Sequence, residues 1–143
     1  MRIRDVLAAK AHPSVLTVVP DLTVRDLLGE LAEHNVGALV VSQDGAALDG
    51  IVSERDVVLH LHDDPEALSA QGGSIMTTEV HTVAPDADLD EVMTVMTERR
   101  IRHVPVLDGS RMVGIVSIGD IVKHKISALQ FERDQLDHYV HQS

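Results

Sequence analysis

The sequence predicts an α/β (α+β) fold in which two pseudo-symmetric β-α-β-β-α repeats pack as one module, followed by a C-terminal helix. The main observation is an internal repeat, because the 143-residue chain aligns with itself at a shift of 64 or 65 residues. The matching segments are 17–21 with 82–86, 35–41 with 100–106, and 50–56 with 114–120. Each copy, at roughly 60 residues, would bury little core alone. We therefore expect the two copies to pack on each other.

Hydrophobic spacing predicts the same elements in both copies. Apolar residues recur at helical spacing over 24–31 and again over 89–96, which predicts an amphipathic helix early in each repeat. Apolar runs bounded by turn residues then predict two strands per repeat. These strands are expected at 36–41 and 50–52 in the first copy, and at 104–107 and 114–116 in the second. A second helix follows each pair of strands.

The repeat divides the chain into three expected segments. These are a first repeat at 1–66, a second repeat at 67–125 and a C-terminal helical extension at 126–143. A polar segment at 63–73, which contains Pro65 and two glycines, is expected to join the repeats as a linker.

The C-terminal extension has an apolar stripe of its own. From Ile121 to about Val140, apolar residues recur at helical spacing. The helix either covers the module or forms a dimer contact that carries Phe131 and Tyr139, since amphipathicity does not show whose surface is covered. We expect a homodimer in either case.

Composition restricts the possible partners. The formal net charge is −11 and Phe131 and Tyr139 are the only aromatic residues, so nucleic acid would be repelled and its bases would find no stacking surface. No run of 18 apolar residues and no signal-peptide pattern is present, which favours a cytoplasmic protein without a membrane span. The absence of cysteine excludes disulfides and thiolate zinc sites. Any anionic ligand therefore needs a local positive site.

The heptad Gly-Ile-Val-Ser-x-x-Asp occurs twice, each time where a strand ends and a helix begins. Ser53 with Asp56, and Ser117 with Asp120, have the spacing of a capping box, which many proteins use without binding anything. The same geometry suits a nucleotide: a helix N-terminus attracts phosphate, and an ionised carboxylate accepts hydrogen bonds from both hydroxyl groups of a ribose diol. The glycines that begin the two heptads, Gly50 and Gly114, would let a ligand approach the strand.

Taken in order, the motifs resemble a pair of CBS domains, the repeat named after cystathionine beta-synthase. They are Thr-Val-x-Pro-Asp, the helix, Ile-Arg-His-Val-Pro-Val and Gly-Ile-Val-Ser-x-x-Asp, and they cover residues 1 to about 125. The resemblance implies a regulatory sensor with two clefts for an adenine nucleotide such as AMP, ADP, ATP or NAD. In this family each cleft combines the Ser-x-x-Asp of one repeat with the Thr-Val segment and second-strand entry of the other.

Carried over residue by residue, the resemblance assigns two sets of binding residues. The first cleft would be formed by Ser53, Arg55, Asp56, Thr82, Val83, Ile101, Arg102, His103 and Pro105. The second cleft would be formed by Ser117, Asp120, Thr17, Val18, Val36, Gly37 and Ala38.

The two clefts are expected to differ in charge. Arg55, Arg102 and His103 can neutralise phosphate in the first cleft. The second has Gly119, Gly37 and Ala38 at the matching positions, which leaves only Lys123 or His124 as nearby cations. The family's proline, present at Pro105, is replaced by Val40 in the first repeat. We therefore expect the first cleft to be the phosphate-binding site.

Enzyme and metal motifs do not emerge from the sequence. There is no Gly-x-Ser-x-Gly elbow, no phosphate-binding Gly-x-x-x-x-Gly-Lys loop and no His-Glu-x-x-His, so we expect a protein without catalytic activity. The run from His60 to Asp64 could bind a divalent cation, but such a run after a helix is more often only solvated. The main alternative to a nucleotide sensor is a ligand-free module that dimerises or holds an effector protein.

Overall fold

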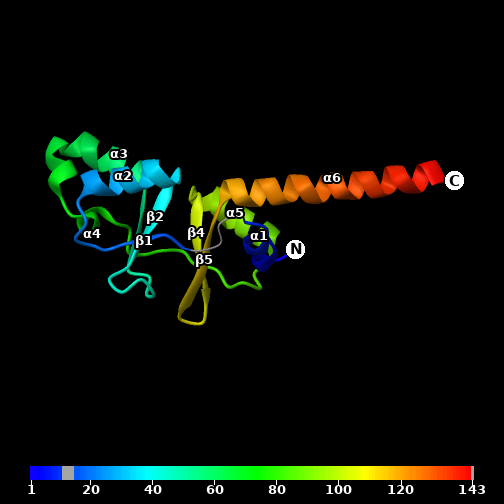
Figure 1. Cartoon of the computed structure of the whole chain (residues 1–143), viewed down its shortest axis with the longest axis horizontal. Coiled ribbons are helices and arrows are strands. Elements are labelled where there is room, and N and C mark those ends of the chain that lie inside the picture. The colour runs from blue at the N-terminus through cyan, green and yellow to red at the C-terminus, as the bar shows by residue number, and fades with distance from the viewer. Residues whose placement is uncertain (11–14, 143) are drawn as a thin grey trace.

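The computed structural model describes residues 1–10 and 15–142 and confirms a mixed α/β fold with two repeats (Figure 1). The first part of the chain contains α1 (Ile3–Ala9), β1 (Thr17–Val18), α2 (Val24–His34), β2 (Ala38–Val41), β3 (Gly50–Ser53) and α3 (Glu54–Asp63). A 3-10 helix, η1 (Pro65–Ser69), and the short α4 (Gly72–Ile75) follow. The second part contains α5 (Leu89–Arg99), β4 (His103–Asp108), β5 (Arg111–Ser117) and α6 (Ile118–Gln142).

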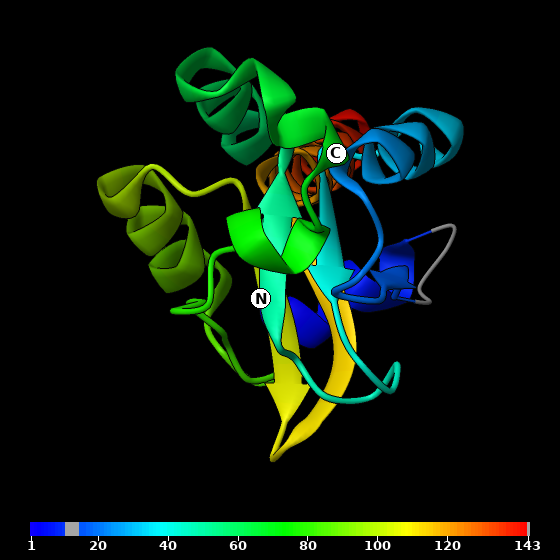
Figure 2. The same ribbon diagram turned by 90° about the vertical axis from the view of Figure 1, so that its left-hand side faces the viewer.

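The strands form two small sheets (Figure 2). In the first, β2 pairs with β1 in parallel and with β3 in antiparallel orientation; in the second, β4 pairs with β5 antiparallel. The counterpart of β1 in the second repeat is a single parallel bridge from Val83 to Val106. Val83 N donates to Pro105 O (3.1 Å) and Leu107 N donates to Val83 O (2.9 Å). The repeats therefore share one topology, with a shorter first strand in the second copy.

Helices α2 and α5 begin and end at matched positions. The side chains of Thr23 and Asp88 each accept a hydrogen bond from the backbone N–H three residues later, which satisfies one of the first-turn donors. The helices end at Asn35 (φ 52°) and Arg100 (φ 56°), both in the left-handed region. Asn tolerates this conformation better than Arg does, so the end of α5 carries more backbone strain.

The short helices α1 and α4 are exchanged between the repeats. Although α1 belongs to the first repeat in sequence, Ile3 and Val6 are buried in the core of the second, with Leu89, Val104 and Ile121. Figure 1 accordingly shows α1 beside β5 and α6. Conversely, Ile75 of α4 completes the core of the first repeat. Each core thus contains side chains from both repeats, and this exchange joins the repeats into one module.

Two glycines make this exchange possible. A Cβ at Gly50 would lie 2.6 Å from Met76 Sδ and 2.9 Å from Thr77 O, and a Cβ at Gly114 would lie 2.6 Å from Leu7 Cδ2. The expectation that these glycines give a ligand access to the strands is therefore wrong. Instead, Gly50 lets the residues that follow α4 pack against β3, and Gly114 lets α1 pack against β5.

The segment at 63–73 is not a simple polar linker, as the sequence suggested. It contains η1 and the start of α4, and Ala67 is buried. Gly72 N donates to Leu22 O (2.7 Å) and Gly73 N donates to Pro20 O (2.8 Å). The segment is tied to the first repeat because its backbone hydrogen bonds have partners there.

The second helix of the second repeat and the C-terminal extension are one continuous helix. Helix α6 has 25 residues, and Ile121 near its start is fully buried. Its distal half projects beyond the module, as Figure 1 shows from the side. Within the described residues, no helix is long and apolar enough to cross a membrane.

Gly50→Ala should lower the free energy of unfolding by about 1–3 kcal/mol, because the new methyl group would overlap Met76 and a backbone carbonyl that cannot rotate away. Urea denaturation measures the change. Gly29→Ala is the matched control: apart from its chain neighbours and the nearby backbone of α2, no atom lies within 4 Å of its Cβ position on the exposed side of the helix. That substitution should instead stabilise the protein by about 0.5–1 kcal/mol. Equal effects of both substitutions would contradict the close contact at Gly50.

Candidate functional site

Both Ser-x-x-Asp motifs stand where a strand passes directly into a helix. Strand β3 ends at Ser53 and β5 ends at Ser117, and the next residue in each case is already helical. Ser53 pairs with Ala38 across the first sheet, and Ser117 pairs with His103 across the second. The heptads therefore place a helix N-terminus next to the entry of the neighbouring strand in both repeats.

Each motif forms a complete capping box. Asp56 Oδ2 accepts hydrogen bonds from Ser53 N (2.9 Å) and Ser53 Oγ (3.0 Å), and Asp56 N donates to Ser53 Oγ (3.2 Å). Asp120 Oδ2 accepts from Ser117 N (2.9 Å), and Asp120 N donates to Ser117 Oγ (3.0 Å). The structural role predicted for the motif is confirmed.

The helix N-termini are less open to an anion than the sequence suggested. Glu54 N already donates to Gly37 O (3.0 Å), and Ile118 N donates to Arg102 O (2.8 Å). The third N–H of each helix donates to the capping serine. Of the first three N–H groups of α3, the second, that of Arg55, is therefore the one without a hydrogen-bond partner among the described residues. The Ser53 hydroxyl also donates its hydrogen bond to Asp56 Oδ2, so it is not free to donate to a phosphate. Phosphate recognition would therefore depend on side-chain cations.

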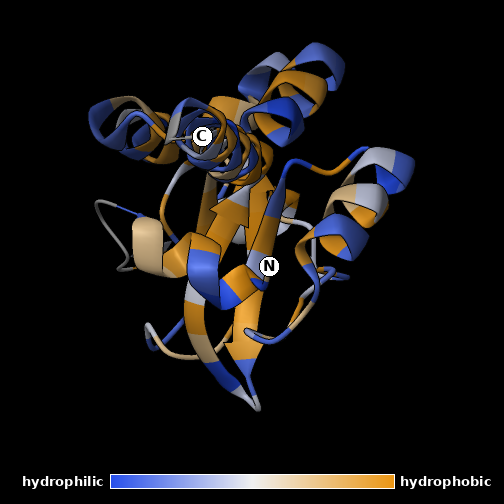
Figure 3. Ribbon diagram, turned by 90° about the vertical axis from the view of Figure 1, so that its right-hand side faces the viewer, coloured by the Kyte–Doolittle hydropathy of each residue, from blue (hydrophilic) through white to orange (hydrophobic). Residues whose placement is uncertain are grey.

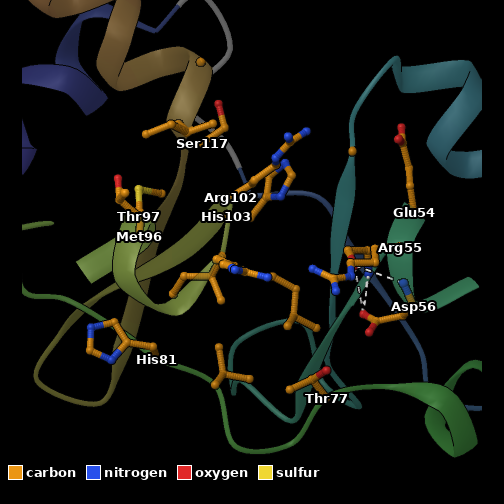
Figure 4. A pocket seen from close by; sticks show the side chains of 18 of the residues that line it. Glu54, Arg55, Asp56, Thr77, His81, Met96, Thr97, Arg102, His103 and Ser117 are labelled. Carbon is orange, nitrogen blue, oxygen red and sulfur yellow. Dashed lines mark hydrogen bonds between the residues drawn. The ribbon is translucent and has the colours of Figure 1, made fainter. Parts of the chain in front are cut away.

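The first cleft is a cavity of about 980 Å³ between the start of α3 and the second repeat (Figure 4). Its size is in the range of small-molecule sites. Six of the nine residues expected there line it: Ser53, Arg55, Asp56, Ile101, Arg102 and His103. The other three do not line it: Val83 N is hydrogen-bonded to Pro105 O in the second sheet, and Thr82 is not among the lining residues.

Several lining residues of the first cleft were not predicted. They come from the end of α5 and from the segment after α4: Thr77, Glu79, Val80, His81, Met96, Thr97 and Arg100. Figure 4 shows Met96, Thr97 and His81 on the side of the cleft opposite Arg55 and Asp56. The available signal was the self-alignment, which places Arg100 opposite Asn35 at equivalent helix ends. Three arginines, Arg55, Arg100 and Arg102, thus reach one cavity.

The second cleft has a volume of about 1100 Å³ and lies between the start of α6 and the end of α2. Five of its seven expected residues line it, namely Ser117, Asp120, Val36, Gly37 and Ala38, and so do the expected cations Lys123 and His124. Thr17 and Val18 do not, because they form β1 against Val40 and Val41.

A cation that the sequence analysis missed occupies the second cleft. Lys10, at the end of the exchanged helix α1, donates to Ile115 O (2.8 Å) and lies 3.0 Å from Asp120 Oδ2. Burial raises the pKa of the Asp120 carboxyl, but the Ser117 backbone N–H and Lys10 outweigh it and hold the pKa below its usual value. Among the residues that the structure describes, no cation forms an ion pair with Asp56 in the first cleft, so the two equivalent carboxylates differ in availability.

His103 lies where the two clefts meet. It lines both, together with Gly37 and Ser117. A Cβ on Gly37 would come within 3.0 Å of the His103 ring, so the imidazole fills space that a larger residue would need. Burial lowers the pKa of His103, an effect that Asp120 and Glu54 oppose and that Lys10 and Arg102 reinforce. The ring is therefore mainly neutral at pH 7.

The run from His60 to Asp64 does not gather into a cluster of metal ligands. His60 Nδ1 instead lies 2.7 Å from Asp56 O, one turn back along α3. Among residues 1–10 and 15–142, the group whose ligand atoms converge is Glu30, Glu33 and His34 on α2. It is largely solvent-exposed, and His34 Nε2 lies 3.2 Å from Glu30 Oε2 as an ordinary i,i+4 pair.

The architecture and both motif copies agree with the comparison to known families. The CBS domain model matches residues 3–63 and 73–127, which is most of the chain. The chain belongs to the CBS domain family. CBS pairs are regulatory modules, and stand-alone CBS proteins are generally regulatory rather than catalytic.

Three relatives show how closely the CBS pair is matched. The mitochondrial CBS domain-containing protein CBSX3 of Arabidopsis thaliana is 38% identical, over 96% of this chain and 71% of that protein. The CBS-domain containing protein ATU1752 from Agrobacterium tumefaciens, known from a crystal structure, is 35% identical in sequence. The structural match covers 87% of this chain and 99% of ATU1752, with a TM-score of 0.83. The CBS domain pair of protein MJ0100, in complex with 5'-methylthioadenosine and S-adenosyl-L-methionine, is 26% identical, with coverage of 90% and 98% and a TM-score of 0.77.

The depressed pKa of His103 predicts a pH dependence of stability. The unfolded state takes up a proton near pH 6.5 while the folded state resists it, so the free energy of unfolding should fall as pH drops below about 6.5. His103→Gln removes this contribution. Urea denaturation between pH 5 and pH 8 should give two curves that run parallel at the alkaline end and diverge at the acidic end, with the wild type losing more. Curves that stay parallel throughout would refute the burial of a neutral imidazole.

Proposed function

We propose that this CBS pair is a regulatory sensor that binds an adenine nucleotide, such as AMP, ADP, ATP or NAD, in the first cleft. The observation that carries the proposal is the placement of an available carboxylate, Asp56, and three arginines around one cavity formed by both repeats. A nucleotide presents a neutral diol and an anionic phosphate on one molecule, so it needs both kinds of group.

The ribose would be held by Asp56. All hydrogen bonds that the structure gives to this carboxylate go to Oδ2, the oxygen used for capping. Oδ1 is left to accept a hydrogen bond from a 2',3'-diol without breaking the cap. Capping and binding are therefore compatible, and the cap fixes the carboxylate before the ligand arrives.

The phosphate would be held by Arg55, Arg100 and Arg102. The protein's net charge of −11 repels polyanions overall, so each bound phosphate needs a local cation. Guanidinium groups suit this role because they donate in pairs to phosphate oxygens. The strained left-handed conformation of Arg100 is consistent with a residue retained for its side chain rather than for its backbone.

The adenine ring would be held by aliphatic contacts. Ile51, Val80, Ile101 and Met96 line the first cleft, whereas the two aromatic residues of the chain, Phe131 and Tyr139, stand outside both clefts. The complex of the MJ0100 pair with two adenosine derivatives supports this class of ligand. The second cleft is the weaker candidate, because a ribose would have to compete with Lys10 for Asp120.

A ligand-free interaction module is the second candidate. The observation in its favour is that both capping boxes are complete without any ligand. In either case the signal would leave through a surface, to a second copy or to an effector protein.

Thermal unfolding with and without AMP, ATP and NAD separates these candidates. A nucleotide that binds only the folded state should add about 2.7 kcal/mol of stability at 100 times its dissociation constant, which appears as a clear rise in Tm. Adenosine without phosphate should give a smaller rise. If no adenine ligand shifts the Tm at millimolar concentration, the interaction module is correct instead.

Arg102→Ala should weaken AMP binding at one site by roughly 10-fold to 100-fold, because a charge-assisted contact is worth about 1.5–3 kcal/mol. Titration calorimetry resolves this site from the second cleft, which lacks Arg102 and should change little. Arg25→Ala, on an exposed position of α2 away from both clefts, is the charge-matched control and should bind as the wild type does. Loss of affinity in both variants would indicate an effect of net charge alone.

A further inference from the structure

The distal half of α6 presents large apolar side chains to solvent. Ile126, Leu129, Leu136 and Val140 are 51%, 63%, 65% and 64% exposed, and Val122 is 42% exposed. Figure 3 looks along the helix from its C-terminal end and shows apolar and polar residues on different sides of it. Such a stripe on a projecting helix suits contact with another helix.

The stripe follows a heptad pattern. The positions 122, 126, 129, 133, 136 and 140 are separated alternately by four and three residues, which is the a/d spacing of a coiled coil. Arg133 is the one polar residue at these positions. Phe131 lies two residues after Leu129, about 200° around the helix, and is therefore on the opposite face. The stripe spans 19 residues from 122 to 140, about 28 Å of helix.

We propose that α6 pairs with α6 of a second copy of this chain, in antiparallel orientation, through this a/d stripe. In the register that aligns the stripes fully, Ile126 packs against the partner's Leu136, and Val122 against the partner's Val140. Arg133 then packs against the partner's Leu129, so the two arginines do not meet. The inference does not depend on nucleotide binding.

Charge decides the orientation. With 122, 129 and 136 as d positions, Lys123 and Asp137 are both e positions. In an antiparallel pair the e positions of the two helices face each other, so each Lys123 lies next to the partner's Asp137. The only like-charge contact at the e and g positions is between Glu132 and the partner's Glu132. In a parallel pair, Glu132 would instead face the partner's Asp137 twice, and both Arg133 side chains would share one core layer. The antiparallel pair therefore has attraction where the parallel pair has repulsion.

The antiparallel pair also avoids collisions between modules. The contact of α6 with its own module ends near Ala128, because every residue from 129 to 141 is exposed. In the aligned register the partner's module lies at the opposite end of the helix pair.

Light scattering and sedimentation test the association. The wild type should have about twice the monomer mass of 15.6 kDa at tens of micromolar. Leu136→Glu should weaken dimerisation by about 10-fold to 100-fold, since the change is made on both helices. Phe131→Glu, at the same exposure of 65% but on the opposite face, should not. A monomeric wild type, or equal behaviour of the two variants, would overturn the proposal.

Charge reversal tests the orientation. Asp137→Lys should weaken the dimer, because the new lysine faces Lys123 of the partner, and adding Lys123→Glu should restore it. In a parallel pair, Asp137→Lys would face Glu132 and strengthen the dimer instead. Strengthening by Asp137→Lys, or failure of the double variant to recover, would refute the antiparallel arrangement.

Discussion

Helix α1 belongs to the first repeat in sequence but contributes Ile3 and Val6 to the core of the second, while Ile75 of α4 completes the core of the first. Neither core is complete within its own repeat. This exchange requires close approach at Gly50 and Gly114, where any side chain would meet Met76 or Leu7. Because the repeats cannot separate without opening both cores, the spaces between them become permanent clefts rather than an occasional interface.

The same exchange makes the two clefts different. Helix α1 ends at Lys10, which reaches Asp120 in the second cleft, whereas α4 is shorter and brings no cation to Asp56. At the junction, His103 occupies the space beside Gly37, so the pseudo-symmetry is broken in the middle as well. One cleft retains an available carboxylate with three arginines, and the other has its carboxylate already paired. The duplicated repeat gives both clefts the same backbone topology, and a few side chains make their binding properties different.

The fold and the two heptads could be predicted from the sequence because a repeated pattern is visible without knowing any contact. The self-alignment located the strands and the caps. The resemblance to CBS pairs supplied the sixteen proposed binding residues, of which eleven line a cleft. Lys10 and His81 could not be found in this way, since Lys10 follows the exchanged helix α1 and His81 lies in the segment after α4. For Arg100 the self-alignment marked an equivalent helix end, opposite Asn35, but not that its side chain reaches the first cleft. The exchange itself leaves little periodic signal: α4 has only four residues and reads as part of a glycine-rich linker.

The capping boxes change which forces can hold a phosphate. At α3 the first and third backbone N–H groups are already bonded to Gly37 and Ser53, so the helix terminus offers one N–H and a partial charge. The larger contribution must come from Arg55, Arg100 and Arg102, which are all solvent-exposed. Exposed charges are screened by salt, whereas the half-buried Asp56 and its cap are screened less. Phosphate affinity in this cleft should therefore depend on ionic strength, while recognition of the ribose should stay nearly constant.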